Sequence, residues 1–249
     1  MGEVSDAVRF NVVTIFPEML TALVCDGVIG RAIAQNRLVV QSWNPRDYAN
    51  NPQRKVDDVP YGGGGGMVMM VQPLFDVLLD IERQGKDGKI IYLTPQGKPL
   101  DQKLVNELAH EPVLTLVAGR YEGFDERIFT LQPGIEISIG DFVVSGGELP
   151  AMLLIDAVAR QLPGVVGSAT SVYQDSFMRD RLDYPQYTRP REFAGCKVPE
   201  LLVNGHHCKI DRWRRKQGLL RTQQRRPDLL LKRILMEEEQ QLLDDKCLS

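Results

Sequence analysis

Short apolar runs alternate with amphipathic stretches over the first part of the chain. Four of these runs have the nearly continuous apolar character of buried strands, namely 8–16, 89–94, 113–119 and 135–140. Helical spacing follows a proline at 17–24, and a charged amphipathic stretch occupies 100–110. Buried strands separated by helices predict an α/β fold, in which a parallel sheet carries helices on both faces.

The pattern changes in the last third of the chain. Residues 147–164 predict a long helix that ends at Pro163-Gly164, and residues 165–200 have no sustained periodicity. Helical spacing returns at 210–222 and 227–243, which predicts a small C-terminal helical domain. We therefore divide the chain into three parts: a main domain at 1–166, an interdomain linker and active-site loop at 167–190, and the helical domain at 191–249.

Three predicted strands end in segments that are rich in glycine and polar residues, namely 92–100, 118–127 and 139–151. In an open α/β sheet, ligands bind beyond the carboxyl ends of the strands. Glycine lets the backbone approach a ligand closely, so that its N–H and C=O groups can bond a polar heteroaromatic ring. One such segment would be an ordinary tight turn. Three in series favour a single pocket.

Five consecutive glycines occupy residues 62–66. The phosphate-binding pattern G-K-[ST] fails, because Gly85-Lys86 is followed by Asp87, and a run of five glycines cannot complete G-x-G-x-x-G. A P-loop NTPase and a standard NAD-binding enzyme are therefore unsupported. We interpret the glycine run as a wall beside the pocket that leaves room for a substrate, anchored by a buried strand at 67–71.

Charge is unevenly distributed along a chain whose net charge is −3. Ten basic residues lie between Lys209 and Arg233, opposed only by Asp211 and Asp228, and an acidic stretch follows them. A polyanion docked at this block and a solvated amphipathic helix both explain the pattern. Residues 171–193 combine carboxylates, arginines and tyrosines, which suit proton transfer, phosphate binding and base stacking; the three candidate bases are Asp175, Asp180 and Asp183.

Composition narrows the class of protein. Hydrophobic residues make up 43% and charged residues 25%, as in ordinary globular proteins, and no apolar run approaches the length of a membrane span. The four cysteines form no C-x-x-C pair, so we expect reduced thiols, a cytoplasmic protein and no zinc site. No membrane partner is expected.

Seven segments together resemble the bacterial tRNA (guanine-N1)-methyltransferase family, TrmD, in order and along essentially the whole chain. They are VVTIFPEML (12–20), DDVPYGGGGGMVMM (57–70), YLTPQGKPLDQ (92–102), GRYEGFDER (119–127), IGDFVVSGGELPAM (139–152), DSF with LDYPQYTRP (175–190), and GHH with RWRRKQ, RT and RRPDLL. The combination is highly specific, whereas most single segments are not.

The resemblance implies a methyltransferase of the SPOUT class that uses S-adenosylmethionine and whose parallel sheet is tied into a trefoil knot. Periodicity alone could not show such a knot, because un-knotted connections are the strong default. The resemblance also implies a homodimer in which the partner subunit completes each active site. The expected reaction methylates N1 of the guanosine at tRNA position 37 when a guanosine precedes it, giving N1-methylguanosine and S-adenosylhomocysteine.

The family's functional positions can be carried over where this sequence matches. The cofactor pocket falls on Tyr92, Leu93, Thr94, Pro95, Gln96, Gly119, Tyr121, Glu122, Gly123, Ile139, Gly140, Val144, Gly146, Gly147 and Pro150. The general base falls on Asp175, with Arg160 as its partner in catalysis. Contacts with tRNA fall on Asp183, Arg189, Arg214, Arg215 and Lys216, and the family's Mg²⁺ would be anchored by Glu122.

Two positions depart from the family pattern. Gly65 stands where the family usually has proline, which should loosen the glycine loop, and Phe142 stands where tyrosine is common. Two other functions stay open: an RNA-binding protein whose pocket has lost its ligand, and a SPOUT methyltransferase that acts on ribosomal RNA or on ribose. Cofactor binding and mapping of the modified nucleotide distinguish them.

Overall fold

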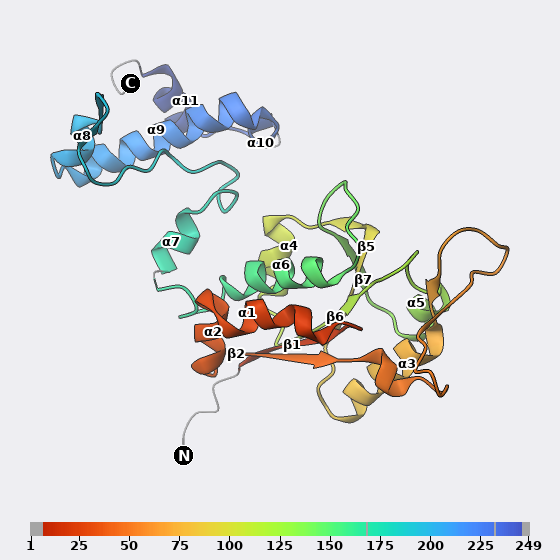
Figure 1. Ribbon diagram of the computed structural model, residues 1–249. Coiled ribbons are helices and arrows are strands. Elements are labelled where there is room, and N and C mark those ends of the chain that lie inside the picture. Colours follow the sequence, from red (N-terminus) through yellow and green to blue (C-terminus); the bar gives the residue numbers. More distant parts are fainter. Residues whose placement is uncertain (1–6, 168, 232, 246–249) are drawn as a thin grey trace. The chain divides into compact units, whose positions relative to one another are not determined.

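The computed structural model describes residues 7–167, 169–231 and 233–245. The chain divides between Ala169 and Thr170 into two compact units, each described here by itself (Figure 1).

The first unit is built on a five-stranded parallel sheet. Its strands are β1 (Val8–Val13), β2 (Leu38–Trp43), β5 (Lys89–Pro99), β6 (Val113–Ala118) and β7 (Ile135–Ser138). They lie in the order β2-β1-β6-β5-β7, and every pair is parallel. The predicted parallel sheet is confirmed, and the carboxyl ends of its strands meet at one edge. Strand β2 was not predicted.

Helices cover both faces of this sheet, as predicted (Figure 1). One face packs against α1 (Thr21–Cys25), α2 (Gly27–Ala34), α4 (Gln102–Leu108) and α6 (Glu148–Ala159). A short 3-10 turn, η1 (Pro17–Leu20), directly precedes α1. The other face packs against α3 (Val71–Arg83) and α5 (Arg127–Leu131), with a second 3-10 turn, η2 (Pro45–Tyr48), beside α3.

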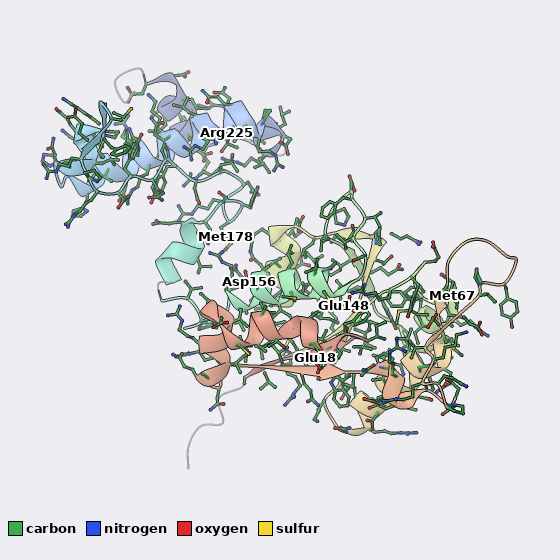
Figure 2. All side chains as sticks on the ribbon, viewed as in Figure 1. Glu18, Met67, Glu148, Asp156, Met178 and Arg225 are labelled. Atoms are coloured by element: carbon green, nitrogen blue, oxygen red, sulfur yellow. The ribbon has the colours of Figure 1, made fainter. Side chains whose placement is uncertain are left out.

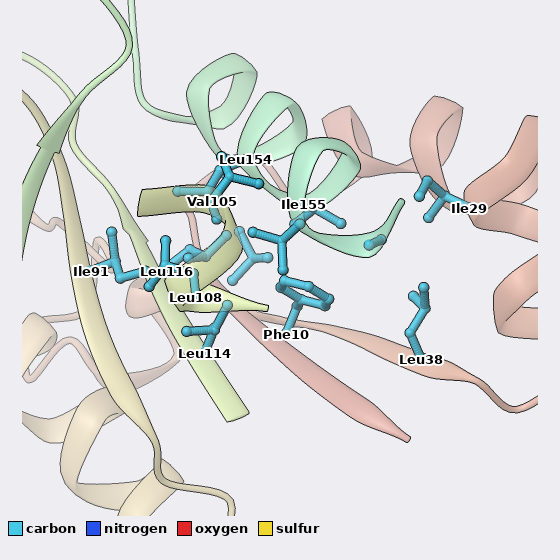
Figure 3. Packing of buried hydrophobic residues seen from close by; sticks show 14 of the residues in the cluster. Phe10, Ile29, Leu38, Ile91, Val105, Leu108, Leu114, Leu116, Leu154 and Ile155 are labelled. Carbon is cyan, nitrogen blue, oxygen red and sulfur yellow. The ribbon is translucent and has the colours of Figure 1, made fainter. Parts of the chain in front are cut away.

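The pleat of β1 sends alternate residues into these two cores. Phe10 and Val12 join the cluster under α6, whereas Val13 joins the cluster under α3. Leu154 and Ile155 of α6 are fully buried against the first cluster (Figure 3), and each such side chain contributes about 1.5–3 kcal/mol of transfer free energy. This packing holds the beginning of α6 at the carboxyl edge of the sheet.

Helix α6 is shorter than the predicted helix 147–164. It ends at Ala159, and Arg160 is its C-terminal cap residue. Pro163 disfavours a helical conformation of the residue before it, so the chain leaves the helix before reaching the proline.

The glycine run lies next to a small hairpin rather than next to a long strand. The segment predicted as a buried strand at 67–71 contains only the two-residue strand β4 (Val68–Met69), which pairs antiparallel with β3 (Asp57–Asp58), and Val71 already begins α3. Of the strand residues, Met69 is buried.

The second unit is mainly helical. It contains all but the first residue of α7 (Ala169–Gln174), followed by α8 (Glu200–Val203), α9 (His207–Arg225), α10 (Pro227–Leu231), α11 (Glu237–Asp244) and a hairpin of β8 (Glu192–Phe193) and β9 (Cys196–Lys197). The predicted helix 227–243 is two helices, because the Glu239 carboxylate accepts the backbone N–H of Met236 at 3.2 Å and so begins α11 anew. None of the helices in the described ranges is long and apolar enough to cross a membrane.

Candidate cofactor and substrate sites

A cavity of about 230 Å³ lies at the carboxyl ends of β5, β6 and β7. Three strand-end segments line it, and they are the three that the sequence singled out. Its walls include all the predicted cofactor residues except Tyr92 and Gly140, namely Leu93, Thr94, Pro95, Gln96, Gly119, Tyr121, Glu122, Gly123, Ile139, Val144, Gly146, Gly147 and Pro150. The structure therefore brings residues from all three segments together around one cavity.

Tyr92 lies outside the walls of this cavity. Its side chain is fully buried on the α3 face of the sheet, where its ring packs edge-on against Phe124 and Phe129. Its hydroxyl donates a hydrogen bond to the backbone carbonyl of Gln132 at 2.7 Å, and burial raises the pKa of the phenol. The Tyr92 side chain thus supports the floor of the site, while Gly140 lies one residue beyond the wall residue Ile139.

The first pocket segment is a bulge in β5. Leu93 and Lys98 both pair with Ile137 of β7, so residues 94–97 loop out of the ladder and β5 then resumes. The sequence predicted that the strand would end at residue 94, but it continues to Pro99 because the bulged segment is bracketed by pairs with the same neighbour.

A buried ion pair joins the second pocket segment to the start of α6. The Nε of Arg120 donates to the Oε2 of Glu148 at 2.8 Å, and Thr14 at the end of β1 donates its hydroxyl to Oε1 at 2.8 Å. Glu148, which is labelled near the beginning of α6 in Figure 2, is fully buried. The Arg120 guanidinium also lies 4.6 Å from the centre of the Phe16 ring and donates to the backbone carbonyl of Ser145 at 3.0 Å. It therefore ties two of the three pocket segments together.

Close backbone approach explains the glycine pair in the third segment. A Cβ at Gly147 would lie 2.6 Å from the Cα of Ala118, and its N–H donates to the carbonyl of Gly119 at 2.7 Å. A Cβ at Gly146 would overlap the guanidinium of Arg120. At Gly147 a side chain would separate two backbone segments that form the cavity, whereas at Gly146 it would displace the Arg120 guanidinium from its ion pair.

The glycine run is connected to the same cavity through Glu122. The N–H of Glu122 donates to the carbonyl of Met67 at 2.9 Å, and Met69 donates to Gly123 at 2.9 Å. Gly66, at a φ of 81°, packs against the Glu122 carboxylate so closely that a Cβ would overlap it. The base of the glycine loop and the second pocket segment therefore form one structure.

Glu122, the predicted anchor of Mg²⁺, is not part of a metal-binding cluster among the described residues. Among the described residues, no group of three His, Cys, Asp or Glu side chains is arranged to hold a metal ion, and Glu122 belongs to no such group. Its surroundings do not form a protein-built cation cage, so no step below is routed through a metal.

The second unit contains all three candidate bases, Asp175, Asp180 and Asp183. Asp183 donates its backbone N–H to the hydroxyl of Ser176 at 3.0 Å. Burial, followed by the charge of Asp175, raises the pKa of the Asp183 carboxyl. The two carboxylates therefore lie within electrostatic reach of each other. Arg160, the predicted partner of Asp175, belongs to the first unit.

The predicted tRNA contacts differ in accessibility. Arg214 lies over the ring of Tyr184, with its guanidinium 4.9 Å from the ring centre, and Arg215 is about half-exposed. Arg189, Arg214, Tyr187 and Trp213 line a cavity of about 410 Å³. Lys216 is buried, and its ammonium donates to the backbone carbonyl of Asp245. Lys216 therefore holds this unit together instead of presenting its charge at the surface.

Much of the basic block is paired with the acidic end of the chain. Arg212 pairs with Asp245 at 3.0 Å and Arg215 with Glu238 at 3.1 Å. Glu239 accepts both terminal nitrogens of Arg233, at 2.6 and 3.0 Å. Both interpretations of this block thus have some basis, because part of its charge stabilises the unit and part remains exposed.

Cys25, Cys196 and Cys208 are free and exposed, whereas Cys247 lies outside the described residues. Sequence reasoning missed several wall residues of the first cavity, including Arg120, Phe124 and Ser145. The position of Arg120 between two predicted wall residues, Gly119 and Tyr121, was a usable signal.

The fold and the cavities define a class: an α/β protein with a ligand pocket at the carboxyl edge of a parallel sheet, followed by an arginine-rich helical unit. A family model described as tRNA (Guanine-1)-methyltransferase TrmD matches residues 8–232. The chain belongs to this family, which confirms the resemblance noted in the sequence.

Similar curated proteins extend over nearly the whole chain. A tRNA (guanine-N(1)-)-methyltransferase of Coxiella burnetii (strain RSA 493 / Nine Mile phase I) is 55% identical over 236 residues, covering 94% of this chain and 96% of the relative. The proteins of the same name from Dechloromonas aromatica (strain RCB) and Pseudoalteromonas atlantica (strain T6c / ATCC BAA-1087) are 51% and 52% identical. The first covers 96% of both chains, and the second covers 97% of this chain and 92% of the relative.

Proposed function

We propose that this protein transfers a methyl group from S-adenosylmethionine to N1 of the guanosine at tRNA position 37. The observation that carries the proposal is the single cavity formed by the three glycine-rich strand-end segments, in a chain of the tRNA (guanine-1)-methyltransferase family. In the reaction, the methyl–sulfur bond breaks, an N1–carbon bond forms and the N1 proton leaves. The products are N1-methylguanosine and S-adenosylhomocysteine.

The cavity walls suit this cofactor. Its backbone-rich segments, from Leu93 to Gln96 and from Gly119 to Gly123, can bond the polar edge of an adenine, and the apolar side chains of Ile139, Val144 and Pro150 can cover its faces. When bound, S-adenosylmethionine supplies an activated methyl group on a sulfonium. The protein's part is to hold the ligand in one orientation, which supplies much of the rate enhancement.

Asp175 is proposed as the general base and Arg160 as its partner. Guanine N1 carries a proton and becomes a good nucleophile only when that proton leaves, and a carboxylate can accept it. An arginine beside O6 can stabilise the negative charge that develops there. Family membership supports the choice of Asp175, and the neighbouring carboxylate Asp183 is proposed to contact tRNA.

The remaining family properties are proposed on the same basis. They are the trefoil knot of a SPOUT sheet, a homodimer in which the partner subunit completes each active site, and a cytoplasmic location. A Mg²⁺ site at Glu122 is not among them, because Glu122 belongs to no metal-binding group of the described residues. Arg189, Arg214 and Arg215 would bind the tRNA backbone, whereas the burial of Lys216 argues against a direct contact.

Labelled S-adenosylmethionine and unmodified tRNA transcripts with guanosine or adenosine at position 37 test the activity. Label in N1-methylguanosine from the guanosine transcript alone supports the proposal. Methylation of ribose or of ribosomal RNA contradicts it, and tRNA binding without any heat of cofactor binding would indicate an RNA-binding protein instead.

Asp175→Asn tests the base. It should bind the cofactor normally and lose methyl transfer by at least about 100-fold, within the usual contribution of a general base. Asp26→Asn is the matched control, because Asp26 is an exposed carboxylate before α2 that lines none of the cavities described here, and it should keep its turnover. Near-normal turnover of Asp175→Asn would exclude that residue as the base.

A further inference from the structure

Four arginines converge in the second unit around a cavity of about 480 Å³. The guanidiniums of Arg179, Arg181, Arg215 and Arg233 line it, against the two carboxylates Glu238 and Glu239. The positive charges therefore outnumber the negative charges along its walls. A surplus of partly buried cationic groups close to one another is unfavourable unless an anion balances it.

The two carboxylates are already largely used by two of these arginines. Glu239 binds Arg233 through both oxygens, and Glu238 accepts from Arg215 at 3.1 Å. Arg181 lies 3.8 Å from Glu239, which is an ion pair but longer than a hydrogen bond. The surplus charge thus lies on Arg181 and Arg179.

The Arg179 side chain is held against a tyrosine ring, but its Nε–H group has no hydrogen-bond acceptor among the described residues. Its guanidinium lies 4.2 Å from the centre of the Tyr173 ring, and its Nε is buried with no hydrogen-bond partner within the described ranges. A buried donor of this kind is costly if nothing binds it. Arg181 is only 19% exposed, and its pKa is lowered first by burial and then by the charge of Arg179. Both side chains are thus fixed beside each other despite their repulsion.

A second cavity shares this wall. Arg179, Arg181 and Arg215 also line a cavity of about 200 Å³ that contains Asp183. The wall therefore lies next to the carboxylate that we propose as a tRNA contact. A planar guanidinium binds phosphate oxygens through two parallel N–H groups, and three guanidiniums at one wall suit such a group.

We propose that Arg179, Arg181 and Arg215 form a binding site for one phosphodiester of the tRNA backbone. The site deepens the proposed function, on which it rests, because it would hold the strand beside Asp183. It differs from the general attraction of the basic helix in that it depends on a small set of oriented side chains.

Arg179→Gln is the first test, with Arg225→Gln as its control. Arg225 is an exposed residue at the end of α9 (Figure 2), belongs to neither cavity, and carries the same charge. We expect Arg179→Gln to raise KM for tRNA about 10- to 100-fold with cofactor affinity unchanged, and Arg225→Gln to raise it only a few-fold. Equal effects of the two substitutions would overturn the site.

A thermodynamic cycle identifies the phosphate. Transcripts with a single neutral methylphosphonate near position 37 are bound to the parent protein and to Arg179→Gln. At one position, the methylphosphonate should weaken binding to the parent protein but have little further effect on binding to Arg179→Gln. Additive effects at every position would overturn the proposal.

The variant Arg179→Lys distinguishes loss of the phosphate site from loss of folding. Lysine keeps the positive charge but lacks the paired N–H donors of the guanidinium. Arg179→Lys should therefore have the same unfolding temperature as the parent and a KM for tRNA between those of the parent and Arg179→Gln. Normal tRNA affinity in Arg179→Lys and Arg179→Gln, with an active parent, contradicts only the phosphate site. A parent protein that forms no N1-methylguanosine contradicts the proposed function itself.

Discussion

Arg120 and Glu148 form an ion pair in which neither partner is well hydrated, with the carboxylate fully buried and the guanidinium 16% exposed. The pair joins the segment after β6 to the beginning of α6, and Thr14 adds a third attachment from β1. A charge removed from such a pair leaves the other charge buried and uncompensated.

Glu148→Gln should therefore lower the free energy of unfolding by about 3–5 kcal/mol and weaken cofactor binding, because Arg120 would no longer hold Ser145 in place. Chemical denaturation and calorimetric titration with S-adenosylmethionine measure the two effects. Arg127→Gln breaks the exposed pair with Asp125 and should cost much less. Similar losses in both variants would contradict the structural role of Glu148.

Gly65 and Gly66 should respond oppositely to alanine although they are neighbours. A Cβ at Gly66 would overlap the Glu122 carboxylate at a φ of 81°, whereas Gly65 has open space and no left-handed φ. Gly66→Ala should displace Glu122 and weaken methyl transfer, with about 1–2 kcal/mol of backbone strain. Gly65→Ala should be neutral or slightly stabilising. Turnover and thermal unfolding are measured for both variants. An equal loss of turnover in Gly65→Ala and Gly66→Ala would show that the whole loop, and not the Gly66–Glu122 contact, determines activity.

Asp183→Asn should stabilise the protein while it impairs function. The pKa of Asp183 is raised by burial and by Asp175, so the folded protein holds the proton more tightly than the unfolded chain does. The ionised carboxylate therefore opposes folding at neutral pH. This effect fades as the pH falls through the raised folded pKa and is absent below the unfolded pKa of about 4. Thermal unfolding at pH 7 should favour the variant, with little difference near pH 3. A lower stability of Asp183→Asn at pH 7 would show that the sign is wrong.

Substitution of Lys216 should affect stability, whereas substitution of Arg214 should affect tRNA binding. Lys216→Gln removes a buried donor to Asp245 and should destabilise the second unit while the salt dependence of tRNA binding stays the same. Arg214→Gln should leave stability nearly unchanged and reduce the slope of log K against log salt by about 0.7–0.9. Filter binding between 50 and 200 mM salt measures the slope for both variants, and thermal unfolding measures their stability. A reduced slope for Lys216→Gln would show that Lys216 contacts tRNA directly.

Local pattern was enough to predict the parallel sheet and the three segments that meet at its edge, because continuous apolar runs and glycine-rich ends are local properties. Strand β2 escaped prediction since LVVQSW mixes apolar and polar residues, and only pairing with β1 makes it a strand. Lys216 was assigned by charge alone. Its spacing of three residues from both Trp213 and Leu219, which are buried on α9, placed it on the inner face of that helix.

Contacts across long sequence separations were the part that local pattern could not supply. Arg120 acts through Glu148 and Phe16, which lie far from it in the sequence. The counter-ions of the basic block likewise come from the acidic end of the chain. Assignment of Asp175 over Asp183 rested on family resemblance, since both residues lie in the same charged stretch.

The bulge at residues 94–97 has a consequence for how this pocket can vary among proteins. Leu93 before it and Lys98 after it are both paired with Ile137, so the looped residues add no step to the ladder between β5 and β7. Insertions or deletions there would resize one wall of the cavity and leave the register of every strand unchanged. The segment is therefore a place where ligand preference can diverge without any cost to the sheet that supports it.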